Sequence, residues 1–344
     1  LSNQELINQL NLPADNNFTR TALLGLMAAK EALNSAQISD INQENTGLIS
    51  STSVGGMDMT EHYFFEYENL PDKQKYILSH DAGDSTHKIA DNIGLKGFTS
   101  TISTACSSAA NAIMMGSKLI QTGRLDRVIV GGTDALSKFT LNGFNSLMIL
   151  SDEFNQPFDE NRKGLNLGEA AAFLVLESDE MVHKYDKKVL AYLSGYANFN
   201  DAYHQTASSE TGEGAFLAMQ KALKIANLSA EQIDYVNAHG TATPNNDASE
   251  SAALKRIFLD HNFDFSSTKP FTGHTLAAAA SVEAVFSILA LQQQKVWANL
   301  NFEQPIPEFG LIPQTHIKPK KIEHVLSNSF GFGGNCSTLI FSKA

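Results

Sequence analysis

The sequence has few cysteines, few charged residues and a single tryptophan for its length. Two cysteines among 344 residues are too few for a disulfide framework, so we expect a reducing, cytoplasmic location. Charged residues make up 18% and hydrophobic residues 42%, which excludes a disordered chain. The net charge of −12 argues against a nucleic-acid or anionic-membrane partner. An acidic partner would need a local basic patch, such as Arg124 with Arg127 or Arg162 with Lys163.

Long hydrophobic runs are also lacking. The most apolar stretches, around residues 105–117 and 275–291, are rich in Ala, Ser and Gly and carry polar groups, unlike a membrane span. The first twenty residues are polar and lack the apolar core of a signal peptide. We therefore expect a soluble protein with a large apolar core.

Helices and short apolar strands alternate along the chain, which predicts an α/β fold. A helix over 20–36 leads to a strand at 47–52, and a helix over 214–226 leads to a strand at 235–238. The two helices match at one constant offset, with alanines and a leucine at equivalent places. This similarity indicates an internal repeat.

A second matched pair supports the repeat. The segments 105–121 and 277–293 align in the same order along the chain, which chance similarity between alanine-rich helices explains less well. Both are apolar almost all round, so each should be a buried central helix. Glu283 lies within one of them and needs a buried partner. We predict two duplicated halves, 1–178 and 179–344.

The repeat is incomplete at its beginning. In the second half, a strand at 188–197 precedes the first helix, whereas nothing equivalent precedes residue 20. We therefore expect that a leading strand and loop are missing from this chain.

Cys106 is the first candidate for chemistry. It lies in STACSSAAN (103–111), after Ser and Thr residues that can cap a helix. A thiol at a helix start lies near free N–H groups and the positive end of the dipole, which lowers its pKa and makes it nucleophilic. The alternative is a small buried apolar cysteine, the commoner case for a lone cysteine.

Three further segments carry polar groups at strand ends. His239 ends a strand in NAHGTATPNNDASE, and His274 precedes the second buried helix in KPFTGHTLAAAA, five residues after Lys269. SNSFGFGGNCS (327–337) is a glycine-rich turn between strands, whose N–H groups can approach a ligand closely. A phosphate loop is disfavoured because no helix with Lys-Ser/Thr follows. A thiol, two histidines, a lysine and such a turn at strand ends form a set for acyl transfer.

The segments TACSSA, NAHGTATPNND, TGHTLAAA and NSFGFGG, in this order, resemble the signature segments of β-ketoacyl-[acyl-carrier-protein] synthases of the elongating I/II class. PFDENRKGLNLGEAAAFLVLE (157–177) resembles the segment that links the two halves in that family. The resemblance extends from about residue 20 onward. It implies the thiolase-like fold, five layers αβαβα built from two similar halves.

The resemblance implies a role for each matching residue. Cys106 would take the acyl chain from its carrier, and His239 and His274 would donate hydrogen bonds to the thioester oxygen of the malonyl unit as carbon dioxide leaves. Lys269 would order this site, and Glu250 would be the acid that pairs with it.

Other matching positions would bind substrate. The backbone N–H groups of Cys106 and Phe332 would form the oxyanion hole. Gly331 lies in the same turn, and Phe332 would also act as a gate between the half-reactions. Thr241 and Thr243 match residues that hold the phosphopantetheine arm.

The resemblance also concerns cations, cofactors and partners. Asn237, Glu283 and Asn328 match positions near a structural cation in some members. No cofactor is implied beyond the phosphopantetheine of acyl carrier protein, the expected partner. We expect a homodimer, or a heterodimer with a chain-length partner.

Several alternatives stay open at this point. A thiolase would use a second cysteine near the C-terminus, where Cys336 stands, but the two histidines with a lysine fit the synthases better. Initiating synthases have Asn in place of His274, and silent chain-length partners lack the nucleophile. Straight saturated chains are the default substrate, and an aryl-polyene or other specialised polyketide pathway is the runner-up. Candidates to line the acyl pocket are Met114, Met115, Phe139 and Phe144, with plain core packing as the commoner alternative for helical Met and Phe.

Overall fold

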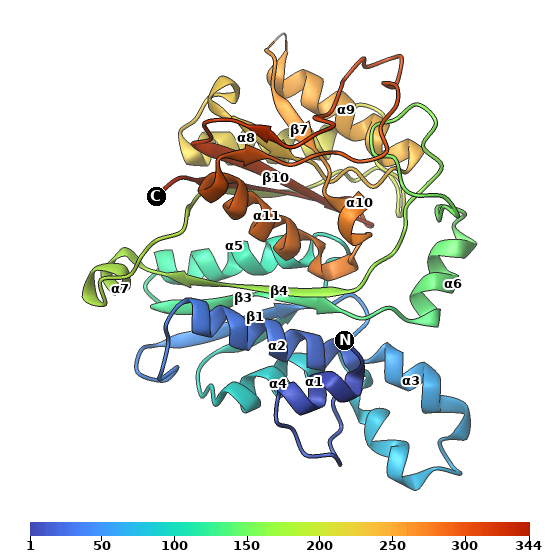
Figure 1. The fold of residues 1–344 in the computed structure, drawn as a ribbon, viewed down its shortest axis with the longest axis vertical. Helices are drawn as coiled ribbons and strands as arrows, with labels where there is room; N and C mark the ends of the chain where they lie inside the picture. Colours follow the sequence, from blue (N-terminus) through green and yellow to red (C-terminus); the bar gives the residue numbers. More distant parts are fainter. Residues whose placement is uncertain (260) are drawn as a thin grey trace.

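Two β-sheets alternate with three layers of helices in the computed structural model, which describes residues 1–259 and 261–344 (Figure 1). The predicted order αβαβα is confirmed. Helices on the outer face of the first sheet are α1 (Asn3–Gln9), α2 (Arg20–Ser35) and α4 (Ala82–Ile93). The central layer holds α5 (Ser108–Gln121) and α11 (Ala279–Gln293), and the opposite outer layer holds α8 (Glu213–Ala226) and α9 (Pro244–Phe258).

The first sheet has four strands in the order β2-β1-β3-β4. The strands β2, β1 and β3 are parallel, and β4 runs antiparallel to β3. The carboxyl ends of these parallel strands lie at one edge of the sheet. At that edge, residues 52–53 follow β1, residues 103–106 follow β2, and residue 134 ends β3. The bounds are β1 (Thr46–Ser51), β2 (Thr99–Ile102), β3 (Arg127–Asp134) and β4 (Ala170–Glu177).

The second sheet has five strands in the order β5-β11-β10-β6-β7. Its strands β7, β6, β10 and β11 repeat the order and directions of β2, β1, β3 and β4. In the described part of the chain, no strand lies beside β4 in the place that β5 has beside β11. The bounds are β5 (Tyr192–Asn200), β6 (Tyr235–Asn237), β7 (Asp264–Ser266), β10 (His324–Gly331) and β11 (Asn335–Ser342).

The remaining elements are short. A small two-stranded sheet pairs β8 with β9. The turn η5 (Leu276–Ala278) leads directly into α11. The other α-helices and strands are α3 (Met57–Tyr63), α6 (Lys138–Ser146), α7 (Asp179–Lys184), α10 (Lys269–Thr272), β8 (Lys295–Val296) and β9 (Lys318–Pro319). The other 3₁₀ helices are η1 (Phe64–Glu66), η2 (Pro71–Tyr76), η3 (Leu78–His80) and η4 (Ala230–Gln232).

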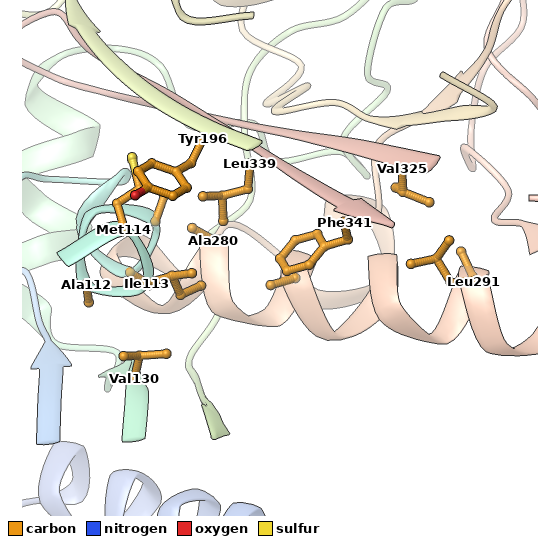
Figure 2. Packing of buried hydrophobic residues seen from close by; sticks show 14 of the residues in the cluster. Ala112, Ile113, Met114, Val130, Tyr196, Ala280, Leu291, Val325, Leu339 and Phe341 are labelled. Carbon is orange, nitrogen blue, oxygen red and sulfur yellow. The ribbon is translucent and has the colours of Figure 1, made fainter. Parts of the chain in front are cut away.

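The central helices form the core between the two sheets (Figure 2). Ile113 and Met114 of α5 pack with Ala280 of α11 and with side chains from both sheets, so Met114 is a core residue. The prediction of two buried central helices is confirmed. The segment Leu276–Gln293 has the length and hydropathy of a membrane span, but 61% of it is buried inside the fold, as expected for a core helix.

Candidate active site

Cys106 lies in the turn between β2 and α5, two residues before the helix begins. Thr104 N donates to Ser108 Oγ at 2.8 Å, and Ser107 Oγ donates to Thr104 O at 2.8 Å, so these residues close the turn. Ala105 has a φ of +51°, a left-handed conformation that costs energy in a non-glycine residue. The strained turn presents the thiol at the carboxyl edge of the first sheet.

The environment of the thiol differs from the expectation. Burial raises the pKa of Cys106 to about 12, and this effect exceeds the lowering by the positive charge of Lys269. The predicted lowering of the thiol pKa at the helix start is therefore wrong for this structure. The resting group is therefore a neutral thiol, and it would have to lose its proton to act as a nucleophile.

His239 and His274 come from separate loops and meet edge to face, with ring centroids 5.4 Å apart. His239 follows β6, and His274 is held by backbone pairing with the segment before β4. There, His274 N donates to Asn166 O at 2.7 Å and Gly168 N donates to His274 O at 3.0 Å. Both side chains are buried, with 2% and 1% exposure.

The hydrogen bonds of the two rings define where their protons lie. Leu276 N donates to His274 Nδ1 at 3.1 Å, and Lys269 Nζ lies 3.2 Å from His239 Nδ1. Since Nδ1 accepts in both rings, the proton of each neutral ring is on Nε2. Burial, with the charge of Lys269 as a further cause, lowers the pKa of both histidines well below its usual value. The site therefore contains two neutral Nε2–H donors.

Lys269 is almost completely buried and pairs with Glu283. Its Nζ also donates to His239 O at 2.6 Å, so the ammonium holds both the ring and the backbone of this histidine. The prediction that Glu250 pairs with Lys269 is wrong: Glu283, on the central helix α11, supplies the counter-charge because its side chain points from α11 to the start of α10.

Glu250 instead holds the backbone at His239. Its carboxylate accepts from His239 N at 3.0 Å, Gly240 N at 2.9 Å and Asn328 Nδ2 at 3.1 Å. Burial raises the pKa of Glu250 to about 7. Gly240 has a φ of +39°, and a Cβ there would lie 2.6 Å from Ser267 Cβ, so this close approach requires glycine.

The glycine-rich turn lies against the cysteine turn. A Cβ on Gly331 would lie 2.9 Å from Thr104 O and 3.1 Å from Cys106 N, so glycine permits the contact. The ring of Phe332 stacks on Phe144 of α6 at 5.7 Å between centroids. The turn thus brings the backbone next to Phe332 against the turn that carries Cys106, from the opposite half of the fold.

The predicted phosphopantetheine residues lie together at the start of α9. Thr241 Oγ1 and Thr243 Oγ1 are 2.9 Å apart. Asp247 binds the intervening Ala242 N at 3.1 Å and so fixes the loop.

The predicted cation site fits in part. Asn237 Oδ1 is buried without a hydrogen-bond partner among the described residues, as a cation ligand would be. Glu283 is bound to Lys269, and Asn328 Oδ1 accepts from Thr338 Oγ1 at 2.8 Å. No group of three or more His, Cys, Asp or Glu residues in the described chain is arranged for a metal ion.

Other candidate residues lie elsewhere. Cys336 packs in the hydrophobic core of the second half, and Phe139 is 55% exposed. Of the residues in the two expected basic patches, Arg127 is buried against Glu177, whereas Arg124 is exposed and Lys163 pairs with Glu153 on the surface. Arg162 donates to the backbone oxygens of Asp159 and Pro244.

Sequence reasoning did not identify Asp134. It is fully buried at the end of β3 and is bound by Thr52, Ser53 and Ala277. The available signal was an acidic residue ending the otherwise apolar strand RVIVGGTD, at the edge where α/β sheets place their sites.

A buried cysteine thiol and two buried neutral N–H donors at strand ends of a thiolase-like fold are the groups that a carbon–carbon condensing enzyme uses. Family models for the β-ketoacyl synthase N-terminal and C-terminal domains match residues 9–181 and 190–303. The chain therefore belongs to the β-ketoacyl synthase family, as the resemblance predicted.

Relatives and solved structures agree with this assignment. The chain is 35% identical over 344 residues to 3-oxoacyl-[acyl-carrier-protein] synthase 2 of Synechocystis, covering 92% of this chain and 80% of the relative. It is 40% identical over 264 residues to the mitochondrial 3-oxoacyl-[acyl-carrier-protein] synthase of Arabidopsis thaliana, covering 73% of this chain but 57% of that relative.

The fold is shared with ketosynthase complexes. The ishigamide ketosynthase/chain length factor superposes with a TM-score of 0.91 at 26% identity, covering 97% of this chain and 84% of that chain. The ketosynthase ApeO, in complex with its chain length factor ApeC from Xenorhabdus doucetiae, gives a TM-score of 0.85 at 32% identity, covering 98% and 84%.

Proposed function

We propose that this chain condenses an acyl group held on Cys106 with malonyl-acyl-carrier protein, releasing carbon dioxide and giving 3-oxoacyl-acyl-carrier protein in fatty acid elongation. The observation that carries the proposal is the pair of buried neutral histidines, whose Nε2–H donors can bind a thioester oxygen. The relatives named as 3-oxoacyl synthases support the same reaction. The enzyme is thus an acyltransferase.

The first half-reaction transfers the acyl chain. The sulfur of Cys106 attacks the carbonyl carbon of the acyl thioester, and the thiol proton leaves with the departing phosphopantetheine sulfur. Negative charge on the carbonyl oxygen would be bound by the N–H groups of Cys106 and Phe332, which the contact at Gly331 brings close together. Thr241 and Thr243 would hold the phosphopantetheine arm.

The second half-reaction forms the carbon–carbon bond. The malonyl carboxylate leaves as carbon dioxide, and its bonding electrons pass to the α-carbon as an enolate. The oxygen of that enolate would accept hydrogen bonds from Nε2 of His239 and His274. The α-carbon then attacks the thioester on Cys106, and the sulfur leaves as a thiolate that takes up a proton from solvent to restore the thiol. Neutral Nε2–H groups suit this step because they can donate hydrogen bonds to the enolate oxygen without transferring a proton to it.

Partners, organisation and location follow the same proposal. The substrates arrive on acyl carrier protein, and no other cofactor takes part. Similar solved structures include a ketosynthase with its acyl-carrier protein and another with its chain length factor, which supports a carrier partner and a heterodimer. The homodimer is the other assembly that we propose. We place the half boundary at residue 178. Two relatives are named mitochondrial, so the cytoplasmic location of this chain is a proposal only.

A ketosynthase of a specialised polyketide pathway is the second candidate. It is favoured by the 32% identity to ApeO and by the likeness to a type II polyketide ketosynthase. The two candidates differ in the acyl chain that Cys106 accepts.

A panel of acyl-carrier proteins tests both candidates. The enzyme is incubated with malonyl-acyl-carrier protein and carriers bearing saturated, polyunsaturated or aryl acyl groups, and products are identified by mass spectrometry. We expect 3-oxoacyl products from saturated chains. Products from polyunsaturated or aryl groups alone would favour the second candidate, and no product from any carrier would contradict both.

A further inference from the structure

Asp134 connects the two halves of the site. It ends β3, is 0% exposed, and accepts from Thr52 Oγ1 at 2.6 Å, Ser53 N at 3.0 Å and Ala277 N at 2.8 Å. Thr52 and Ser53 follow β1 in the first half, whereas Ala277 lies in η5 of the second half. The carboxylate therefore bonds across the boundary between the halves.

The turn that Asp134 holds is the turn that orients His274. Leu276, the residue before Ala277, donates its N–H to His274 Nδ1 at 3.1 Å. Leu276 also has a φ of +55°, a conformation that a leucine adopts only when its surroundings impose it. A Cβ on Gly132 would lie 3.0 Å from Ala277 O, so β3 packs tightly against this strained turn.

The bonding requires a carboxylate. One oxygen faces Thr52 Oγ1 and Ser53 N, and the other faces Ser53 N and Ala277 N. An amide has one accepting oxygen, so asparagine would set its NH2 group against a backbone N–H. No salt bridge to Asp134 occurs among the described residues, and all these donors are neutral. A buried charge without a cation is unfavourable, which argues for a role beyond simple packing.

We propose that Asp134 is a positioning residue for His274. By binding Ala277 N, it keeps η5 in the conformation in which Leu276 N occupies Nδ1 and the ring proton stays on Nε2. The proposal rests on the proposed function, in which that Nε2–H binds the enolate oxygen.

The charge of Asp134 has a second effect, on the nucleophile. Burial is the main cause of the raised pKa of the Cys106 thiol, Lys269 opposes it, and the negative charge of Asp134 adds to it. Loss of the charge should therefore increase thiol reactivity, while loss of the bond to η5 should slow the step that uses His274. A residue that only stabilises the fold would lower both activities.

The test compares Asp134→Asn with the wild type and with Asp159→Asn. Asp159 is a matched control because it is also 0% exposed and accepts three backbone N–H groups, from Asn161, Glu303 and Gln304. Two rates are measured on the full chain: alkylation of Cys106 by iodoacetamide, followed by intact mass, and decarboxylation of malonyl-acyl-carrier protein.

For Asp134→Asn we expect decarboxylation to fall by about 10- to 100-fold while alkylation of Cys106 becomes faster. Asp159→Asn should leave both rates unchanged. Wild-type decarboxylation in folded Asp134→Asn, or a parallel fall of both rates, would overturn the proposal. If that variant does not fold, Asp134→Glu, which keeps the charge but displaces it, should slow decarboxylation alone, and a wild-type rate would overturn the proposal. Absence of decarboxylation in the wild type would instead contradict the proposed function.

Discussion

Glu250 and Glu283 hold two sides of His239 in different ways. Glu283 neutralises the lysine that touches the ring, whereas Glu250 binds the backbone N–H groups of His239 and Gly240. Only neutral groups donate to Glu250, so burial is not offset by a cation and its pKa rises to about 7. The carboxyl therefore takes up a proton in the folded protein at a pH where the unfolded chain is ionised.

This difference predicts a pH dependence of stability. Between the ordinary pKa of 4.5 and the folded value of about 7, the folded state binds more protons at Glu250 than the unfolded state. Its contribution to the free energy of unfolding thus falls as pH rises through this window, by up to about 3 kcal/mol. Denaturant unfolding of wild type and Glu250→Gln should show a wild-type advantage that shrinks from pH 4.5 to 7. An advantage that is constant or grows with pH would contradict the shift.

At the scale of single residues, the sequence predicts some parts of the site better than others. Cys106, His239 and His274 stand in long motifs, so their positions at strand ends follow from the sequence. The identity of the acidic partner of Lys269 does not follow from the sequence, because it depends on how α9 and α11 approach α10. Asp134 was missed because two of its donors, Thr52 and Ala277, lie 82 and 143 positions away.

At the scale of the structural element, the backbone of the glycine-rich turn at Gly331 packs against the turn that carries Cys106. Alanine at position 331 would place a Cβ 3.1 Å from Cys106 N and 2.9 Å from Thr104 O, and both neighbours are backbone atoms that resist movement. The turn would have to withdraw and take Phe332 N with it.

Gly331→Ala should therefore slow acyl transfer to Cys106 by about 10²-fold, the usual effect of losing one oxyanion donor. Intact-mass kinetics of acyl-enzyme formation measure this rate. Gly143→Ala is a suitable control, because a Cβ there meets nothing within 4 Å. Equal acylation by Gly331→Ala and the wild type would show that the turn does not form the oxyanion hole.

Element prediction was most accurate where hydrophobic pattern decides the structure. The helices over 20–36 and 214–226 are observed at Arg20–Ser35 and Glu213–Ala226. The helix expected from 105 begins at Ser108, because the strained turn at Ala105 and Cys106 precedes it. The same turn explains the error in the thiol pKa: a helix start is visible in the sequence, whereas its burial under the second half is not.

At the scale of the whole molecule, apolar side chains remain exposed on neighbouring elements. Glu61 of α3 accepts from Lys138 N and Phe139 N at the start of α6, so these two helices are adjacent. Phe65 after α3 is 91% exposed, and Phe139 of α6 is 55% exposed. Such apolar residues on adjoining elements are typical of a surface that another subunit covers.

We accordingly predict that the chain is a dimer in solution. Light scattering coupled to size-exclusion chromatography at micromolar concentration should give about twice the mass of one chain. Phe65→Ser should shift the population toward monomer without changing the circular dichroism spectrum. If the wild type is monomeric, the homodimer is contradicted, and a heterodimer with a chain-length partner is the assembly that is left.

The duplicated architecture places the proposed nucleophile on one half and the histidines of the proposed decarboxylation step on the other. Cys106 follows β2 of the first sheet, whereas His239 and His274 belong to the second half, and Asp134 and Gly331 form the contacts between them. The proposed condensation would therefore require both halves to be docked.

The most direct test follows both half-reactions in one mixture by intact mass. Wild-type enzyme given a saturated acyl-carrier protein should gain one acyl adduct, and on addition of malonyl-acyl-carrier protein should lose it as 3-oxoacyl-acyl-carrier protein and carbon dioxide form in equal amounts. Cys106→Ala should gain no adduct and make no 3-oxoacyl product. An adduct that persists on Cys106→Ala, or condensation without it, would contradict the account.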